Sequence, residues 1–145
     1  MVYVITMEAI MESSLGLQSA RPRAAVPVAR VLYVLAVLFM LFDVFGKFTL
    51  PAAVVDAFHR QGMPIALAPV IGGLLLALVI LYVIPRTSVL GAVLLTGYLG
   101  GACAINMRAE FSAFETLFPV LFGVIVWIPI YLLNERVRAL IPIRR

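Results

Sequence analysis

The chain has 145 residues, of which 64% are hydrophobic and 12% are charged, and its mean hydropathy is +1.14. Soluble domains carry roughly a quarter of their residues as charges, so the composition excludes a soluble globule and indicates a membrane protein. The net charge of +4 comes from basic residues at the edges of apolar runs, which argues against a nucleic-acid-binding stripe. Its one cysteine, Cys103, cannot form an intramolecular disulfide or a paired thiolate metal site.

Residues 1–28 precede the first long apolar run, and we expect a poorly ordered cytoplasmic tail there. Glu8 and Glu12 interrupt the apolar residues of this segment, and its arginines come afterwards, which is the reverse of a secretory signal. The natural first residue could be Met1, Met7 or Met11.

Four apolar segments follow, each close to the ~20 residues that a helix needs to cross a ~30 Å hydrocarbon core. They cover about residues 29–48, 63–84, 88–107 and 115–133. Pro69 lies in the first two turns of the second segment and predicts a kink. The segments predict an all-α membrane protein, a four-transmembrane-helix bundle over residues 29–145.

A short interfacial helix is expected between spans one and two, in the segment TLPAAVVDAFHRQG. Thr49 is placed to cap it, Pro51 lies near its start, and Gly62 can end it. Phe58 would then face the bundle or the lipid.

The distribution of basic residues predicts the orientation. Four spans place both termini and the loop between spans two and three on one side, with eight of the eleven basic residues. The other side has three: Lys47, Arg60 and Arg108. The positive-inside rule therefore places both termini in the cytoplasm. Four aromatic residues lie toward the cytoplasmic ends of their spans, where an interfacial belt and plain packing explain them equally well: Tyr33, Tyr82, Trp127 and Tyr131.

Span three contains an unusual group of glycines. Gly97 and Gly101 form a GxxxG pair, and small residues allow the close backbone approach on which helix association in lipid depends. We therefore predict that both glycines pack against a neighbouring helix. The alternative is that they leave room for a ligand.

Polar residues gather toward the outer ends of spans one and three. Asp43 lies within the hydrocarbon, and Lys47 follows one helical turn later. This pair could be a self-contained ion pair that fixes helix depth, or it could face a wet cavity and mark a ligand site. Because spans one and three run in the same direction, we expect Asn106 and Arg108 to converge with this pair. The hydroxyl of Tyr98, near mid-membrane, requires an interhelical partner or a ligand.

The sequence contains no metal-ligand pair at helical spacing, no phosphate-binding loop and no nucleophile beside a base. It therefore predicts no catalytic or metal-binding residue, and the cofactor stays unknown.

The segment VIPRTSVLGAVLLTGYLGGACAINMRAE, residues 83–110, resembles the DoxX-like family of small bacterial membrane proteins. The likeness continues in LFDVFGKF, PVIGG and RVRALIPIRR and covers residues 29–145. It implies a four-helix bundle in the bacterial inner membrane, and it links some relatives to quinone-coupled or thiol-related oxidoreductase assemblies. The family pattern often has an acid where this chain has Leu75 and a histidine where it has Asn106, which argues against catalysis by this chain alone.

Two function hypotheses follow. The first is a non-catalytic membrane subunit or scaffold, which docks a membrane or soluble oxidoreductase partner or forms a homo-oligomer. The alternative is a component of a membrane oxidoreductase system that binds a lipophilic, quinone-type ligand at the outer ends of spans one and three. Lipid extracted from the purified protein would distinguish them.

Overall fold

The computed structural model describes residues 25–140, so most of the predicted tail lies outside the described residues. Four long helices are present: α2 (Ala25–Thr49), α4 (Ala68–Val83), α5 (Ser88–Arg108) and α6 (Ala113–Leu133). Each lies in a segment that is long and apolar enough to cross a membrane. The short helix α3 (Ala52–Arg60) connects the first two. The predicted four-helix membrane bundle with a short helix between spans one and two is therefore confirmed.

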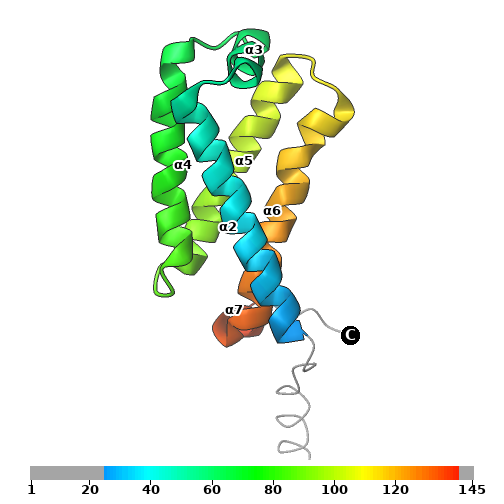
Figure 1. Ribbon diagram of the computed structural model, residues 1–145. Helices are drawn as coiled ribbons and strands as arrows, with labels where there is room; N and C mark the ends of the chain where they lie inside the picture. Colours follow the sequence, from blue (N-terminus) through cyan, green and yellow to red (C-terminus); the bar gives the residue numbers. More distant parts are fainter. Residues whose placement is uncertain (1–24, 141–145) are drawn as a thin grey trace, which may run out of the picture.

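The long helices form a ring in which α2 and α5 both pack against α4 and α6 (Figure 1). Helices α2 and α5 consequently stand diagonally opposite each other and run in the same direction. Helix α3 covers one end of the ring, and the short helix α7 (Glu135–Leu140), which the sequence analysis did not predict, lies at the other. We refer to these as the α3 end and the α7 end.

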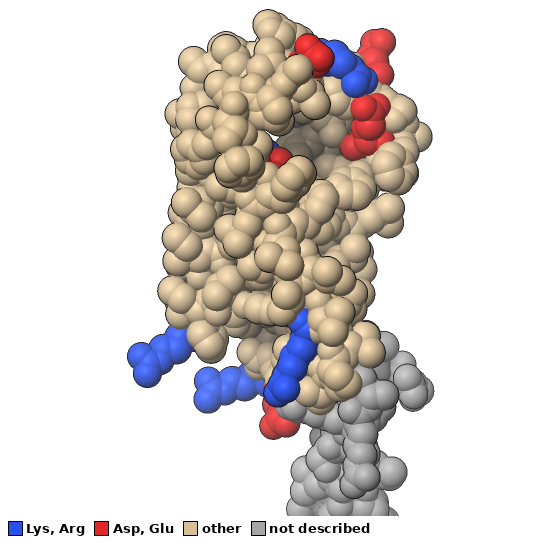
Figure 2. Space-filling model, viewed as in Figure 1, with Lys and Arg blue, Asp and Glu red and all other residues tan. Residues whose placement is uncertain are grey.

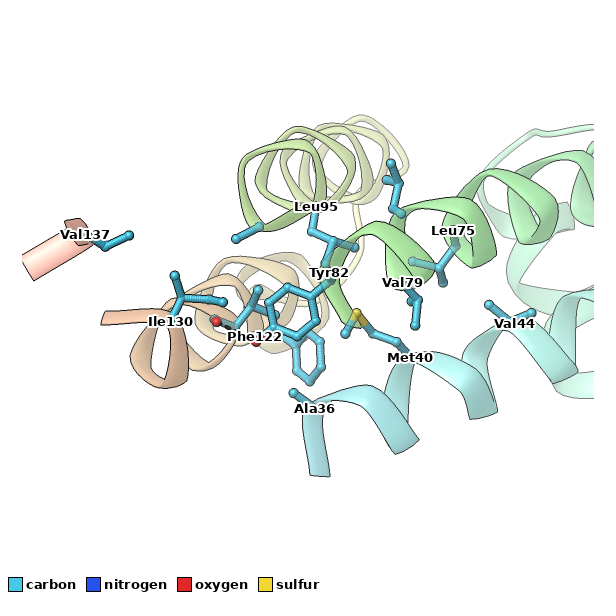
Figure 3. Packing of buried hydrophobic residues seen from close by; sticks show 13 residues of the cluster. Ala36, Met40, Val44, Leu75, Val79, Tyr82, Leu95, Phe122, Ile130 and Val137 are labelled. Atoms are coloured by element: carbon cyan, nitrogen blue, oxygen red, sulfur yellow. Dashed lines mark hydrogen bonds between the residues drawn. The ribbon is translucent and has the colours of Figure 1, made fainter. Parts of the chain in front are cut away.

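Tyr82 organises the half of the core nearest the α7 end. Its side chain is completely buried, and its hydroxyl donates a hydrogen bond of 2.9 Å to the backbone carbonyl of Val126 on α6. The hydroxyl of Tyr33 on α2 donates to the backbone carbonyl of Tyr82 at 3.1 Å, and the two rings stack at 5.0 Å. Figure 3 shows the Tyr82 ring close to Leu95 and Phe122. Interhelical packing, and not an interfacial belt, therefore explains these two tyrosines.

The chain comes into close contact at two glycines for which no packing was predicted, Gly72 and Gly91. A Cβ atom at Gly91 would lie 2.4 Å from the backbone nitrogen of Tyr82, and one at Gly72 would lie 2.9 Å from Cβ of Lys47. A side chain larger than hydrogen does not fit at either position. Gly91 thus allows α4 and α5 to touch just beyond the loop that connects them.

The packing prediction for Gly97 and Gly101 is wrong. A Cβ atom at either position would meet no atom of residues 25–140 within 4 Å. The physical reason is that α4 and α5 touch near Gly91 and diverge toward the α3 end (Figure 1). The two glycines lie on the diverging part of α5, so they face open space.

Two local predictions also need correction. Pro69 stands in the first turn of α4, after a 3₁₀ turn at Ile65–Leu67, so it starts the helix and does not kink it. Thr49 does not cap α3, because its hydroxyl donates to the carbonyl of Phe45 in its own helix. Gly62, with a φ of +65°, does follow the end of α3, as predicted.

We predict that Gly91→Ala destabilises the bundle. The new Cβ would clash with backbone that no rotamer change can move, and overfilling a packed core costs roughly 1–3 kcal/mol. Thermal unfolding in detergent would measure the loss, with Gly97→Ala as the matched control on the same helix. Equal melting temperatures for the two variants would contradict the contact at Gly91.

Candidate ligand-binding cavity

A cavity of about 590 Å³ lies in the half of the bundle nearest the α3 end. Residues from α2, α3, α4, α5 and α6 line it, and most of them are apolar. Figure 2 shows a hollow in this half of the molecule, with acidic and basic atoms visible inside it. Its volume falls within the range of small-molecule sites, roughly 300–1,000 Å³.

Small residues on the lining create this space. The wall formed by α5 includes Gly97, Gly101 and Ala102, and α3 contributes Ala53 and Ala57. None of these residues has a side chain long enough to fill the interior between the diverging helices. The glycines that were expected to join two helices therefore line a cavity, which was the alternative left open for them.

The ion pair on α2 forms part of the cavity wall. Lys47 Nζ lies 2.5 Å from Asp43 Oδ1, one helical turn away, and both residues line the cavity. The side chain of Lys47 is 12% exposed, whereas that of Asp43 is 41% exposed. Lys47 is covered because its Cβ packs close to Gly72 on α4. The carboxylate is therefore the more accessible member of the pair.

Tyr98 lines the cavity from α5, opposite α2. Asp43 lines the same cavity from α2. Within residues 25–140, the Tyr98 hydroxyl has no hydrogen-bond partner. Of the two expectations for this hydroxyl, an interhelical partner is absent from the described residues, and a ligand stays a prediction.

A second set of polar contacts joins three helix ends at the rim of the cavity. Asn106 Nδ2 donates to the carbonyl of Glu115, and its Oδ1 accepts from Gln61 Nε2, both at 2.9 Å. Arg108 Nη2 donates to the carbonyl of Gln61 at 2.9 Å, and Arg60 forms an ion pair of 3.2 Å with Glu115. We call these five residues the rim network. It ties the end of α5 to the end of α3 and the start of α6.

The structure thus brings together four of the five predicted polar residues: Asp43, Lys47, Tyr98 and Asn106 all line the cavity. Arg108 does not line it, and the cation paired with Asp43 is Lys47. Arg108 therefore meets Asn106 in the rim network, as expected, but it does not converge with Asp43 and Lys47. Its guanidinium lies in the rim network because the end of α3 presents a backbone carbonyl within its reach.

Three members of the rim network were not predicted as site residues: Arg60, Gln61 and Glu115. A signal for Glu115 was present, because Ser112 and Glu115 have the spacing of a capping box. In the structure the Ser112 hydroxyl accepts from the Glu115 amide, and the Glu115 carboxylate accepts from the Ser112 amide. Gln61 carried no comparable signal, since its role depends on where α3 ends.

We predict that Asp43→Asn destabilises the protein more than the double replacement Asp43→Asn with Lys47→Met. The single change leaves a covered ammonium group without its partner, whereas the double change removes both charges. Breaking a fully buried pair costs roughly 3–5 kcal/mol, and we expect less here because the Asp43 side chain is 41% exposed. Chemical or thermal unfolding in detergent would show whether the single variant is less stable than the double variant.

The control for this pair is Asp43→Asn combined with Arg108→Met. Arg108 does not contact Asp43, so the second replacement should restore no stability. A rescue by Arg108→Met that equals the rescue by Lys47→Met would contradict the assignment of Lys47 as the partner.

Comparison with protein families matches residues 31–129 to the DoxX-like family. Comparisons with curated proteins and with solved structures found no match. The matched segment covers about two thirds of the chain and includes most of α2 and α6 and all of the helices between them. The chain, with four helices suited to cross a membrane, therefore belongs to the DoxX-like family of integral membrane proteins.

Proposed function

We propose that this protein binds a lipophilic ligand inside the bilayer, in the cavity between α2 and α5. The observation that carries the proposal is the composition of the cavity, about 590 Å³ of mostly apolar space with an accessible carboxylate and a free phenol at its wall. Ligand sites typically combine an apolar lining with a few polar groups that orient the ligand. A purely structural bundle gives neither the space nor the free hydroxyl of Tyr98 a role.

The position of the glycines supports entry of the ligand from the membrane. Gly97 and Gly101 line the cavity and are exposed, and they belong to α5, which diverges from α4 toward the α3 end (Figure 1). In a bilayer their exposed surface faces the acyl chains. A ligand dissolved in the membrane would therefore reach the cavity without passing through water.

A quinone-type lipid belongs to this class of ligand, and it would make the protein a component of a membrane oxidoreductase system. The scaffold hypothesis, with a docked partner or a second copy of the chain, requires no such ligand. The two functions differ in what is bound to the purified protein. The scaffold would carry bulk phospholipid alone.

The test is the lipid extracted from purified protein and from three leucine variants. Gly97→Leu and Gly101→Leu should lower the amount of the enriched lipid, because their side chains would extend into the cavity. Gly100→Leu is the matched control: a Cβ there also meets no atom within 4 Å, but Gly100 does not line the cavity. All three variants should fold. Bulk phospholipid alone in the wild-type extract would refute ligand binding and favour the scaffold.

We further propose that both termini lie in the cytoplasm of a bacterium, with the protein in its inner membrane. Four arginines of the described chain lie at the α7 end, and Figure 2 shows basic side chains gathered there: Arg30, Arg86, Arg136 and Arg138. The α3 end has three basic residues and four acidic ones: Asp43, Asp56, Glu110 and Glu115. An excess of Lys and Arg marks the cytoplasmic side.

A reporter enzyme that is active only outside the cytoplasm would test the orientation. Fused after Arg145, it should show background activity, whereas the same reporter inserted after Glu110, in the loop before α6, should be active. The reverse pattern would refute the proposed orientation.

A further inference from the structure

We infer that the cavity selects a lipophile with a neutral head group that donates a hydrogen bond, such as a long-chain alcohol, over a lipophile with an anionic head group. This inference rests on the proposed function, because it assigns the class of ligand for the same cavity. It follows from which charge and which hydrogen-bonding atoms the cavity wall leaves available.

The charge that is accessible from the cavity is negative. Among the residues of the described chain that line the cavity, the charged ones are Asp43 and Lys47. The ammonium of Lys47 is already paired, and its side chain is only 12% exposed, while the Asp43 side chain is 41% exposed. An anionic head group would therefore meet a carboxylate first. In a site of low dielectric constant, two like charges repel each other strongly.

The available hydrogen-bonding atoms suit a hydroxyl group. Asp43 accepts the Lys47 hydrogen bond through Oδ1, and Oδ2 has no partner within residues 25–140. An ionised carboxylate can only accept hydrogen bonds, whereas the phenol of Tyr98 can both donate and accept. A ligand hydroxyl could thus donate to Asp43 and accept from Tyr98, since both residues line the cavity. A head group without a hydrogen-bond donor could accept a hydrogen bond from Tyr98 but could not donate one to Asp43.

The two amides that line the cavity do not offset this preference. Gln61 Nε2 donates to Asn106, and Asn106 Nδ2 donates to the carbonyl of Glu115. Each amide therefore uses one of its two N–H donors in the rim network, and neither amide carries a positive charge that could offset the charge of Asp43. Arg108, which could neutralise an anion, lies outside the cavity lining and donates to the carbonyl of Gln61.

The experiment compares three probes with the same carbon chain: hexadecanol, methyl hexadecanoate and hexadecanoate at a pH at which it is ionised. Binding of each radiolabelled probe to the detergent-purified protein would be measured by equilibrium dialysis against matched empty micelles. We expect hexadecanol to bind at least about tenfold more tightly than either other probe, which is the effect of one hydrogen bond to a charged group.

Replacing Asp43 tests the origin of the preference. Asp43→Asn removes the negative charge and leaves the Lys47 ammonium unpaired, so the preference should invert toward hexadecanoate. If this variant does not fold, the double replacement Asp43→Asn with Lys47→Met removes both charges, and the affinities for alcohol and carboxylate should become similar. Glu110→Gln is the control, because Glu110 is an exposed acid at the same end that does not line the cavity. It should leave the preference unchanged.

The outcomes separate this inference from the proposed function. Binding of none of the probes to the wild-type protein, together with bulk phospholipid alone in its extract, would refute ligand binding itself. Binding of hexadecanoate or the methyl ester as tightly as hexadecanol would overturn the inference while leaving the proposed function in place. An unchanged preference in the folded Asp43 variant would also overturn it, since the selectivity would then arise elsewhere.

Discussion

The contact between α4 and α5 at Gly91 is the constraint on which the arrangement of the bundle depends. Because Gly91 has no side chain, the backbone at Tyr82 comes closer to α5 than any Cβ atom would allow. Tyr82 in turn holds α6 through its hydroxyl and α2 through its carbonyl. All four long helices are therefore joined at one level near the α7 end, and toward the other end α4 and α5 diverge (Figure 1).

The opposite end of the bundle is held by a different kind of interaction. There the rim network joins α3, α5 and α6 through side-chain hydrogen bonds and an ion pair. Backbone packing at one end and polar contacts at the other leave the space between them without a filling side chain. The cavity follows from this difference, and the Asp43–Lys47 pair gives its wall a polar region that faces mostly apolar surroundings.

Hydropathy was sufficient to predict the spans and the bundle, because the thickness of the bilayer determines how long an apolar helix must be. The pairing of Asp43 with Lys47 was also predictable, since one helix brings both residues to the same face. The helix contacts made by the glycines could not be predicted from the sequence. A GxxxG pattern describes the surface of one helix, whereas contact depends on where its neighbour crosses, and α4 crosses α5 at Gly91. Arg108 was misplaced for a similar reason, because its partner is a backbone carbonyl whose position depends on the end of α3.

The short connection between α4 and α5 also has a consequence for how the chain assembles. Tyr82 and Gly91 are separated by only nine residues, from 82 to 91, so their contact closes a small loop. The hydrogen bonds from Tyr82 to Val126 and from Tyr33 to Tyr82 span 44 and 49 residues. Loop-closure entropy increases with the length of the loop, so local contacts form first. The α4–α5 hairpin can therefore form as soon as both helices have entered the membrane, before α6 has been synthesised, and it then offers a buried tyrosine to which the first and last spans attach.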